Sequence, residues 1–300
     1  MKKWALTLAV LAGICASAQA NDGDGGGGGV GGIGTWLWKK NGDAMGATAI
    51  ITDADGQTGA LQHLQQHAFT RVYGSYGNAV LEQRQALAHW NQTLASHGIE
   101  SQYLMASNHW ALPGGQTRLL DKVSTHFIAF QQAVTVEQRF QALHFDIEPH
   151  ALSEWKQATP EVRRQLLWNL AHALTAVRQL LDRHQLQQVR IYADIPTWYD
   201  SSAKIAWADN GSAYFATLAQ AIDGVSIMAY ERDQADSILN ATVFERSLQS
   251  EQFRVRLAVD VSDTWPTPEH MNSVISTLQA QGAAVDVHDF TDHYYWLNSQ

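Results

Sequence analysis

The amino-acid sequence predicts an α/β protein in which residues 35–300 form a single (β/α)8 TIM-type barrel. From Thr35 onward, short runs of strand-forming residues alternate with amphipathic helical stretches, a pattern typical of repeated β/α units. Eight such runs occur in a length suited to one domain, and no Gly-x-Gly-x-x-Gly fingerprint follows the first of them. These observations favour the closed barrel over an open, doubly wound sheet, which is the alternative.

Residues 1–20 are typical of a cleavable signal peptide. Lys2 and Lys3 give a positive start, an apolar stretch follows, and residues 18–20 offer a small-residue cleavage site. We therefore expect cleavage after Ala20 and a periplasmic or secreted mature protein. An amino-terminal membrane anchor is the weaker alternative, because the apolar stretch is shorter than the ~20 residues that span a bilayer. Lipid attachment at Cys15 is a third alternative.

The mature chain predicted in this way is acidic and free of cysteine. Cys15 is the single cysteine, and loss of Lys2 and Lys3 leaves 18 basic against 29 acidic residues, a formal net charge of −11. Such a surface argues against nucleic acid and anionic lipid as partners. No later stretch is apolar enough for membrane insertion after leader cleavage. Residues 21–34 are rich in glycine and predict a flexible linker.

The strands and helices of the barrel can be placed from the pattern. The clearest helix covers residues 160–186, where leucines and Val177 fall on one stripe. Thr159 and Thr267 each precede a proline and a glutamate, which predicts a capped helix start. The predicted strands are residues 35–38, 69–73, 101–106, 142–148, 189–195, 224–230, 255–261 and 284–288.

Side-chain parity predicts which residues face the barrel axis. Successive side chains of a strand point to opposite faces, and the apolar set should pack against the helices. In each of strands four to eight, the last side chain that faces the axis is then ionisable or phenolic. These side chains lie at the carboxyl ends of the strands, the mouth of the barrel, where barrel enzymes have their active sites. These residues are Glu148, Asp194, Tyr230, Asp260 and His288. Carboxylates crowded there repel one another, so a ligand, a proton or a cation is expected among them.

Asp146 and Glu148 are two residues apart on the fourth predicted strand. Their carboxyl groups should therefore lie on the same side of the barrel, close enough to couple, and coupling raises the pKa of one of them. We expect Glu148 to keep the proton at neutral pH and to act as a general acid, while ionised Asp146 orients or stabilises positive charge.

The sequence D-I-E at the end of strand four and M-A-Y at the end of strand six resembles the chitinase-like glycoside hydrolases of the family 18 type. The resemblance implies that Asp146 positions an acetamido group of the substrate, that Glu148 protonates the glycosidic oxygen, and that Tyr230 supports the acetamido group. In that family the substrate itself is the nucleophile, with retention of configuration.

The sequence departs from the family pattern at Gln141, Ala142 and His144, and at Glu231, where an aspartate usually follows the tyrosine. The substrate class is therefore left open between an amino-sugar glycan and another polysaccharide. In an ordinary retaining mechanism Glu148 would remain the acid, and Glu231 or Asp260 would be the nucleophile.

Aromatic residues near the strand ends support a sugar ligand, because flat rings with polar edges stack on pyranose faces. Burial against a neighbouring loop is the competing role for each of them. Trp198 and Trp110 are the strongest candidates, since each lies in a loop next to inward polar positions. The predicted substrate-binding residues are Trp36, Tyr73, Trp110, Asp194, Trp198, Glu231, Asp260 and His288.

Two other classes of function stay open. His144, Asp146, Glu148 and His150 alternate along one segment and suggest a metal-dependent hydrolase. We expect no metal and no cofactor, because Pro149 should turn His150 away and the first strand offers no His-x-His pair. The other alternative is a non-catalytic carbohydrate-binding barrel. The sequence does not indicate an oligomeric state.

Overall fold

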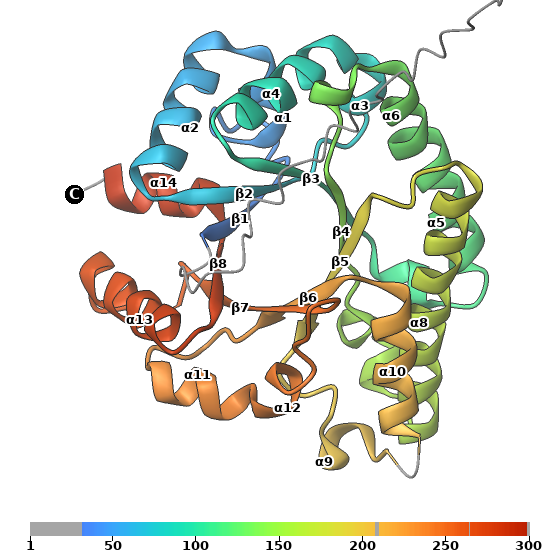
Figure 1. Cartoon of the computed structure of the whole chain (residues 1–300). Coiled ribbons are helices and arrows are strands. Elements are labelled where there is room, and N and C mark those ends of the chain that lie inside the picture. Colours follow the sequence, from blue (N-terminus) through green and yellow to red (C-terminus); the bar gives the residue numbers. More distant parts are fainter. Residues whose placement is uncertain (1–31, 208–209, 264, 299–300) are drawn as a thin grey trace, which may run out of the picture.

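The computed structural model describes residues 32–207, 210–263 and 265–298. The predicted signal peptide and all but the last three residues of the predicted linker lie outside the described residues. Eight parallel strands form a closed barrel in sequence order, surrounded by helices (Figure 1). The predicted single (β/α)8 barrel is thus confirmed.

The eight strands lie where the alternating pattern placed them. β1 begins two residues early, since Ile33 pairs with Phe69 and Gly34 with Arg71. Ile33 and Gly34 therefore belong to the barrel and not to the predicted linker. β4 and β6 each end two residues early, so that Glu148 and Tyr230 follow their strands. The strands are β1 Ile33–Leu37, β2 Phe69–Gly74, β3 Glu100–Ala106, β4 Ala142–Asp146, β5 Arg190–Pro196, β6 Gly224–Met228, β7 Arg254–Asp260 and β8 Ala284–His288.

The helices cover the outside of the barrel. The α-helices are α1 Ala47–Thr52, α2 Ala54–Gln66, α3 Ala79–Glu82, α4 Arg84–Ser96, α5 Gly115–Lys122, α6 Ala129–Ala133, α7 Ser153–Lys156, α8 Pro160–Arg183, α9 Ser202–Ile205, α10 Gly211–Ala221, α11 Ala235–Ala241, α12 Val243–Arg246, α13 Pro268–Ala280 and α14 Phe290–Asn298. A π-helical turn, η2 Val123–Ile128, joins α5 to α6, and short 3-10 turns are η1 Asn108–Ala111, η3 Val136–Gln138 and η4 Pro149–Ala151.

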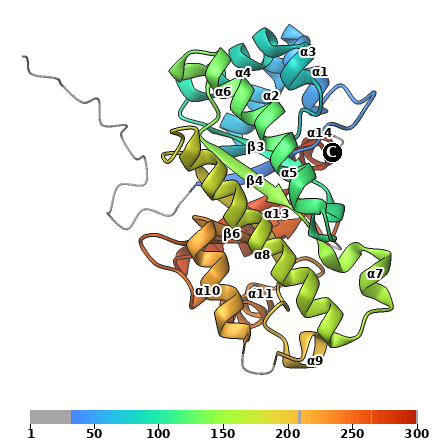
Figure 2. The same cartoon turned by 90° about the vertical axis from the view of Figure 1, so that its right-hand side faces the viewer.

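The long helix α8 packs beside α5 and α10 along one side of the barrel (Figure 2). Thr267 caps α13 by accepting a hydrogen bond from the backbone of His270, as predicted. Thr159 occupies the N-cap position of α8, as predicted, but its side chain accepts no hydrogen bond from the helix backbone. Pro160 at the first helical position starts α8 instead, since its fixed φ suits the first turn.

The apolar core lies between strands and helices, as parity requires. Phe145 and Ile147 of the fourth repeat are buried among the helices, while His144 points to the axis and contacts Asp194 of β5. A smaller apolar cluster of Trp36, Tyr73, Leu104 and Ala258 fills part of the barrel interior. Within the described ranges, none of the helices combines the length and apolar character that a membrane span requires.

Candidate active site

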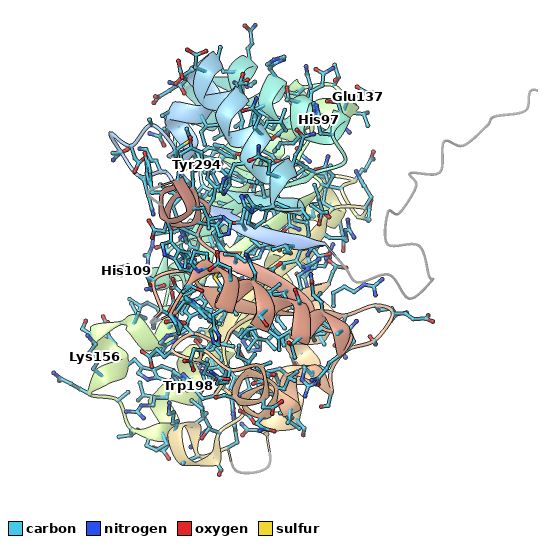
Figure 3. All side chains as sticks on the ribbon, turned by 90° about the vertical axis from the view of Figure 1, so that its left-hand side faces the viewer. His97, His109, Glu137, Lys156, Trp198 and Tyr294 are labelled. Carbon is cyan, nitrogen blue, oxygen red and sulfur yellow. The ribbon has the colours of Figure 1, made fainter. Side chains whose placement is uncertain are left out.

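A cavity of about 380 Å³ opens at the carboxyl ends of the strands. The segments that follow β3, β4 and β5 lie on this side of the molecule, where His109, Lys156 and Trp198 are labelled (Figure 3). His97 and Glu137, which precede β3 and β4, lie on the other side. The cavity brings together eight of the predicted site residues: Trp36, Asp146, Glu148, Asp194, Trp198, Tyr230, Glu231 and His288.

Glu148 is held at the cavity wall from two sides. Its backbone N–H donates to Oδ1 of Asn108 at 2.8 Å, which fixes the chain just after β4. Its carboxylate Oε2 lies 2.9 Å from Nε2 of His150, and Nδ1 of His150 lies 3.0 Å from the hydroxyl of Tyr199. The prediction that Pro149 turns His150 away was therefore wrong. Pro149 begins the turn η4, and this turn brings the imidazole back over Glu148.

The two carboxyl groups of the pair have pKa values displaced in opposite directions. Burial raises the pKa of Asp146 well above its ordinary value, and the nearby charges of Asp194 and Glu148 raise it further. The hydrogen bond from His150 lowers the pKa of Glu148, against the opposing effect of burial. The two shifts therefore run opposite to the prediction, which gave the raised pKa to Glu148. Glu148 is the more exposed of the two and has a hydrogen-bond partner, His150, within reach.

A buried polar network lies below the pair. Nε1 of Trp36 donates to Oδ2 of Asp194 at 2.9 Å, and Oδ1 of Asp194 lies 2.7 Å from Nε2 of His144. Burial raises the pKa of Asp194 and lowers that of His144 to about 3. His144 is therefore neutral, and its contact with Asp194 is a buried hydrogen bond. Nδ1 of His144 lies 3.0 Å from Oε1 of Gln102 on the other side of the ring.

His288 forms the opposite wall of the cavity. Nε1 of Trp38 donates to Nε2 of His288 at 3.0 Å, and Nδ1 of His288 lies 3.2 Å from Oδ2 of Asp260. Burial opposes charge on this imidazole, but the hydrogen bond and charge of Asp260 outweigh it and raise the pKa of His288. Asp260 does not line the cavity. It fixes His288 from behind, so its predicted direct contact with a substrate is corrected to a positioning role.

Tyr230 and Glu231 follow β6 at the cavity rim. Burial and the surrounding carboxylates raise the pKa of Tyr230, so its phenol keeps its proton and is a hydrogen-bond donor. The backbone N–H of Glu231 donates to Oδ2 of Asp263 at 2.8 Å, and its φ of 62° is left-handed. Arg232 donates to the carbonyl of Tyr230 at 2.8 Å and also lines the cavity.

The predicted aromatic residues divide into three groups. Trp198 is partly exposed in the cavity wall, with Nζ of Lys204 lying 4.5 Å from its ring centroid. Trp36 touches the cavity but is only 1% exposed. Tyr73 and Trp110 were predicted wrongly: Tyr73 is fully buried and stacks on His144, and Trp110 packs against the outer core away from the cavity.

Sequence reasoning missed two cationic groups of the site, Lys204 and Arg232, and considered His150 only as a metal ligand. Each lies in a segment that follows a strand, and this position was the one available signal. No periodicity marks such loop residues. The described residues contain no group of three or more histidine, cysteine, aspartate or glutamate side chains arranged to hold a metal ion. His144, His150 and His288 are each engaged with a carboxyl group instead.

Comparisons with known proteins show the fold. No protein-family model and no curated protein sequence matches this chain. The "putative Chitinase A" of Streptomyces coelicolor is 9% identical, with a TM-score of 0.54 over 90% of this chain and 95% of that one. The spore cortex-lytic enzyme SleL of Bacillus cereus is 10% identical, with a TM-score of 0.51 over 89% of this chain and 74% of that one.

A chitinase of Chromobacterium violaceum is 12% identical, with a TM-score of 0.45 over 77% of this chain and 69% of that one. For a chitinase domain of Ostrinia furnacalis, the matched part is 64% of its length. The two TM-scores above 0.5 show a shared barrel fold, and at identities of 9% and 10% function has to be argued from the site.

Proposed function

We propose that this protein is a glycoside hydrolase that acts on an amino-sugar glycan, with Glu148 as the general acid and with Asp146 and Tyr230 stabilising the transition state. One observation carries the proposal: the three residues of the D-I-E and M-A-Y motifs converge on one cavity with tryptophan in its wall. The names of the two structures with TM-scores above 0.5, a chitinase and a cortex-lytic enzyme, support a polysaccharide as the substrate class.

The raised pKa of Asp146 supports a proton path to the leaving group. In this proposal Asp146, whose pKa is raised, holds a proton beside Glu148, whose pKa is lowered and which is ionised before the substrate binds. A bound glycan excludes water from Glu148 and favours its neutral form. The proton then passes from Asp146 to Glu148 and on to the glycosidic oxygen as the bond breaks. Asp146 is left ionised, next to the positive charge that develops on the sugar.

Tyr230 and Asp146 are the groups proposed to orient a 2-acetamido group. The phenol of Tyr230 is a donor, and Oδ1 of Asp146 is buried without a hydrogen-bond partner among the described residues. A buried polar atom of this kind is suited to a ligand that completes its hydrogen bonding. The acetamido oxygen would attack the anomeric carbon, so that the substrate supplies the nucleophile.

The decisive test compares Glu148→Gln with wild type on N-acetylated oligosaccharides and on the corresponding hexose oligosaccharides. We expect wild type to cleave the N-acetylated series, and Glu148→Gln to bind it with kcat lowered about 100-fold or more, because general acid catalysis contributes about 10²–10⁴. Glu154→Gln is the matched control, since Glu154 is exposed on α7 outside the cavity. Full activity of Glu148→Gln would refute the proposal.

A third variant separates the two retaining mechanisms. If Glu231→Gln retains turnover and hexose oligosaccharides resist cleavage, the substrate is the nucleophile. If Glu231→Gln loses turnover and hexose oligosaccharides are cleaved, an enzymic carboxylate is the nucleophile and the amino-sugar specificity is wrong.

A non-catalytic carbohydrate-binding barrel is the second candidate. The contact between His150 and Glu148 favours it, because it lowers the pKa of Glu148 and so opposes the protonated form that a general acid needs. This function predicts binding of an oligosaccharide without cleavage in wild type. It also predicts the same dissociation constant for wild type and Glu148→Gln, measured by calorimetry.

Export and partners complete the proposal. We propose that the chain is exported to the periplasm or secreted, and that the leader is removed after Ala20. The proposed partner is a glycan, without nucleic acid and without membrane insertion of the mature protein. Amino-terminal sequencing of the protein recovered outside the cytoplasm tests the cleavage site.

A further inference from the structure

A second cavity, of about 300 Å³, lies at the opposite end of the barrel, where β7 and β8 begin. Four arginine side chains line it together with Gln249 and Gln281, and none of the described residues that line it is acidic. The arginines are Arg71, Arg246, Arg254 and Arg256. We call this cavity the arginine pocket. Its volume is at the lower end of the range of small-molecule sites.

The arginines of this pocket come from three separate parts of the chain. Arg254 and Arg256 share one face of β7, because they are two residues apart on a strand. Arg71 reaches the pocket from β2 across the barrel, and Arg246 from the last residue of α12. Guanidinium groups therefore converge from several directions on one hollow, in a protein whose formal net charge is −9.

The polar atoms of this pocket are incompletely satisfied. Arg256 is only 5% exposed, and its Nη1 has no hydrogen-bond partner among the described residues. Nε of Arg71 and Nε of Arg246 are also buried without a partner there. Tyr192 covers one face of the Arg256 guanidinium, 4.3 Å from the ring centroid to Cζ. A guanidinium cannot lose its proton in a protein, so burial of this kind favours an anionic ligand.

Asp286, a carboxylate beside the arginine pocket, is already engaged. Asp286 accepts hydrogen bonds from the backbone of Gly34 at 3.0 Å and from the hydroxyl of Ser226 at 2.8 Å, and Nη2 of Arg71 lies 3.4 Å from it. Asp286 is thus occupied by three donors, and the carboxylates of Asp286 and Glu100 act on Arg256 only through their charge. Nη1 of Arg256 therefore stays buried without a hydrogen-bond partner among the described residues.

We propose that the arginine pocket binds a phosphate group, carried by inorganic phosphate or by a small phosphorylated molecule. Phosphate oxygens point in several directions and accept bidentate hydrogen bonds from guanidinium groups, whereas a carboxylate presents two oxygens in one plane. The pocket volume is roughly ten times the ~30 Å³ that one water occupies in the liquid, so there is room for a phosphate and a further small group. This site is separate from the proposed hydrolytic site and does not depend on it.

Isothermal titration calorimetry of the full chain tests this site, with inorganic phosphate and glucosamine 6-phosphate as probes at constant ionic strength in sodium chloride. We expect saturable binding at one site per chain. Arg246→Gln and Arg254→Gln should each weaken binding at least about tenfold, because each removes one charge-assisted contact. These two arginines are only partly buried, so both variants should fold. Arg183→Gln is the matched control, since Arg183 is exposed at the end of α8.

The two probes distinguish the sources of the phosphate group. Equal affinity for both indicates free phosphate, and tighter binding of glucosamine 6-phosphate indicates a phosphorylated molecule; either result supports the site. Absence of saturable binding to both probes would overturn the proposal. Unchanged affinity in Arg246→Gln and Arg254→Gln would overturn it as well. Glu148→Gln should bind both probes as wild type does, so the outcome is independent of the hydrolytic function.

Discussion

The mouth of the barrel gathers carboxyl groups and aromatic rings, whereas its floor, at the amino ends of β7 and β8, gathers arginines. A single strand face spans both regions. Arg254, Arg256, Ala258 and Asp260 share one parity on β7, so the charge along this face reverses from floor to mouth. Inward positions of one strand thus serve two different sites.

The two regions differ in how the energetic cost of burying a charged side chain can be reduced. A buried carboxyl group can take up a proton, and burial raises the pKa values of Asp146 and Asp194 in that direction. A buried guanidinium has no neutral form at ordinary pH, so stacking or an anion must stabilise it. The mouth is therefore suited to moving protons, and the floor to holding a negative group. The following predictions test this contrast.

The largest effect is expected for Asp146→Asn at the mouth. The amide keeps the shape and can still donate a hydrogen bond, but it cannot hand a proton to Glu148. We expect kcat for the cleaved glycan to fall about 100-fold, with a small change in KM. The matched variant is Asp223→Asn on the amino-terminal side of the barrel, where the carboxylate accepts from Arg178 and from the backbone of Ile191. That variant should lower stability while kcat stays within about threefold; equal losses of kcat would contradict the contrast.

His150→Gln should change the pH dependence of cleavage. Removal of the imidazole removes the main cause of the lowered pKa of Glu148, so its pKa rises. Glu148 then stays protonated to higher pH, and the alkaline limb of the kcat profile moves to higher pH. The control His184→Gln, at the exposed end of α8, should leave the profile in place. A limb that moves to lower pH would refute the proton path through Glu148.

Trp198→Ala should weaken substrate binding, because Trp198 is the partly exposed tryptophan of the loop after β5. We expect KM to rise about 2–12-fold, which corresponds to the ~0.5–1.5 kcal/mol of an aromatic contact. Trp110→Ala is the comparison variant, since Trp110 packs outside the cavity. It should reduce the melting temperature and leave KM unchanged. The opposite pattern in KM would restore Trp110 as the sugar-binding residue.

Much of the barrel can be predicted from sequence, because strand period and helix period are local properties. The inward positions Asp146, Asp194 and His288 followed from parity alone and meet in one cavity. Parity could not predict which of the inward-facing side chains are exposed in the cavity. Trp36 and Tyr73 have inward parity but lie below the mouth, where the network around His144 buries them.

Residues outside the regular strands escaped prediction for a different reason. The position of His150 depends on the turn that begins at Pro149. A short turn of this kind has no repeating sequence pattern from which it could be predicted. The arginine pocket escaped because its residues are distant in sequence and lie at the amino ends of the strands. That end is ordinarily associated with stability rather than with ligands.

The smallest effects are expected for two tyrosines that lie at different depths. The hydroxyl of Tyr192 is buried without a hydrogen-bond partner among the described residues, while its ring stacks on Arg256 near the floor. Tyr192→Phe keeps the ring and removes the unpaired hydroxyl, so the free energy of unfolding should change by less than about 0.5 kcal/mol. The hydroxyl of Tyr199 lies 3.0 Å from Nδ1 of His150 at the mouth.

Tyr199→Phe removes that hydrogen bond and should lower the free energy of unfolding by about 1 kcal/mol, measured by urea denaturation. It should also lower the rate of glycan cleavage, since the hydrogen bond from Tyr199 helps to hold the His150 ring in contact with Glu148. Tyr192→Phe should leave that rate unchanged. If Tyr192→Phe were the more destabilising of the two, the hydroxyl near the floor would have a partner in solution, and an ordered water or anion beside Arg256 would be the group to look for.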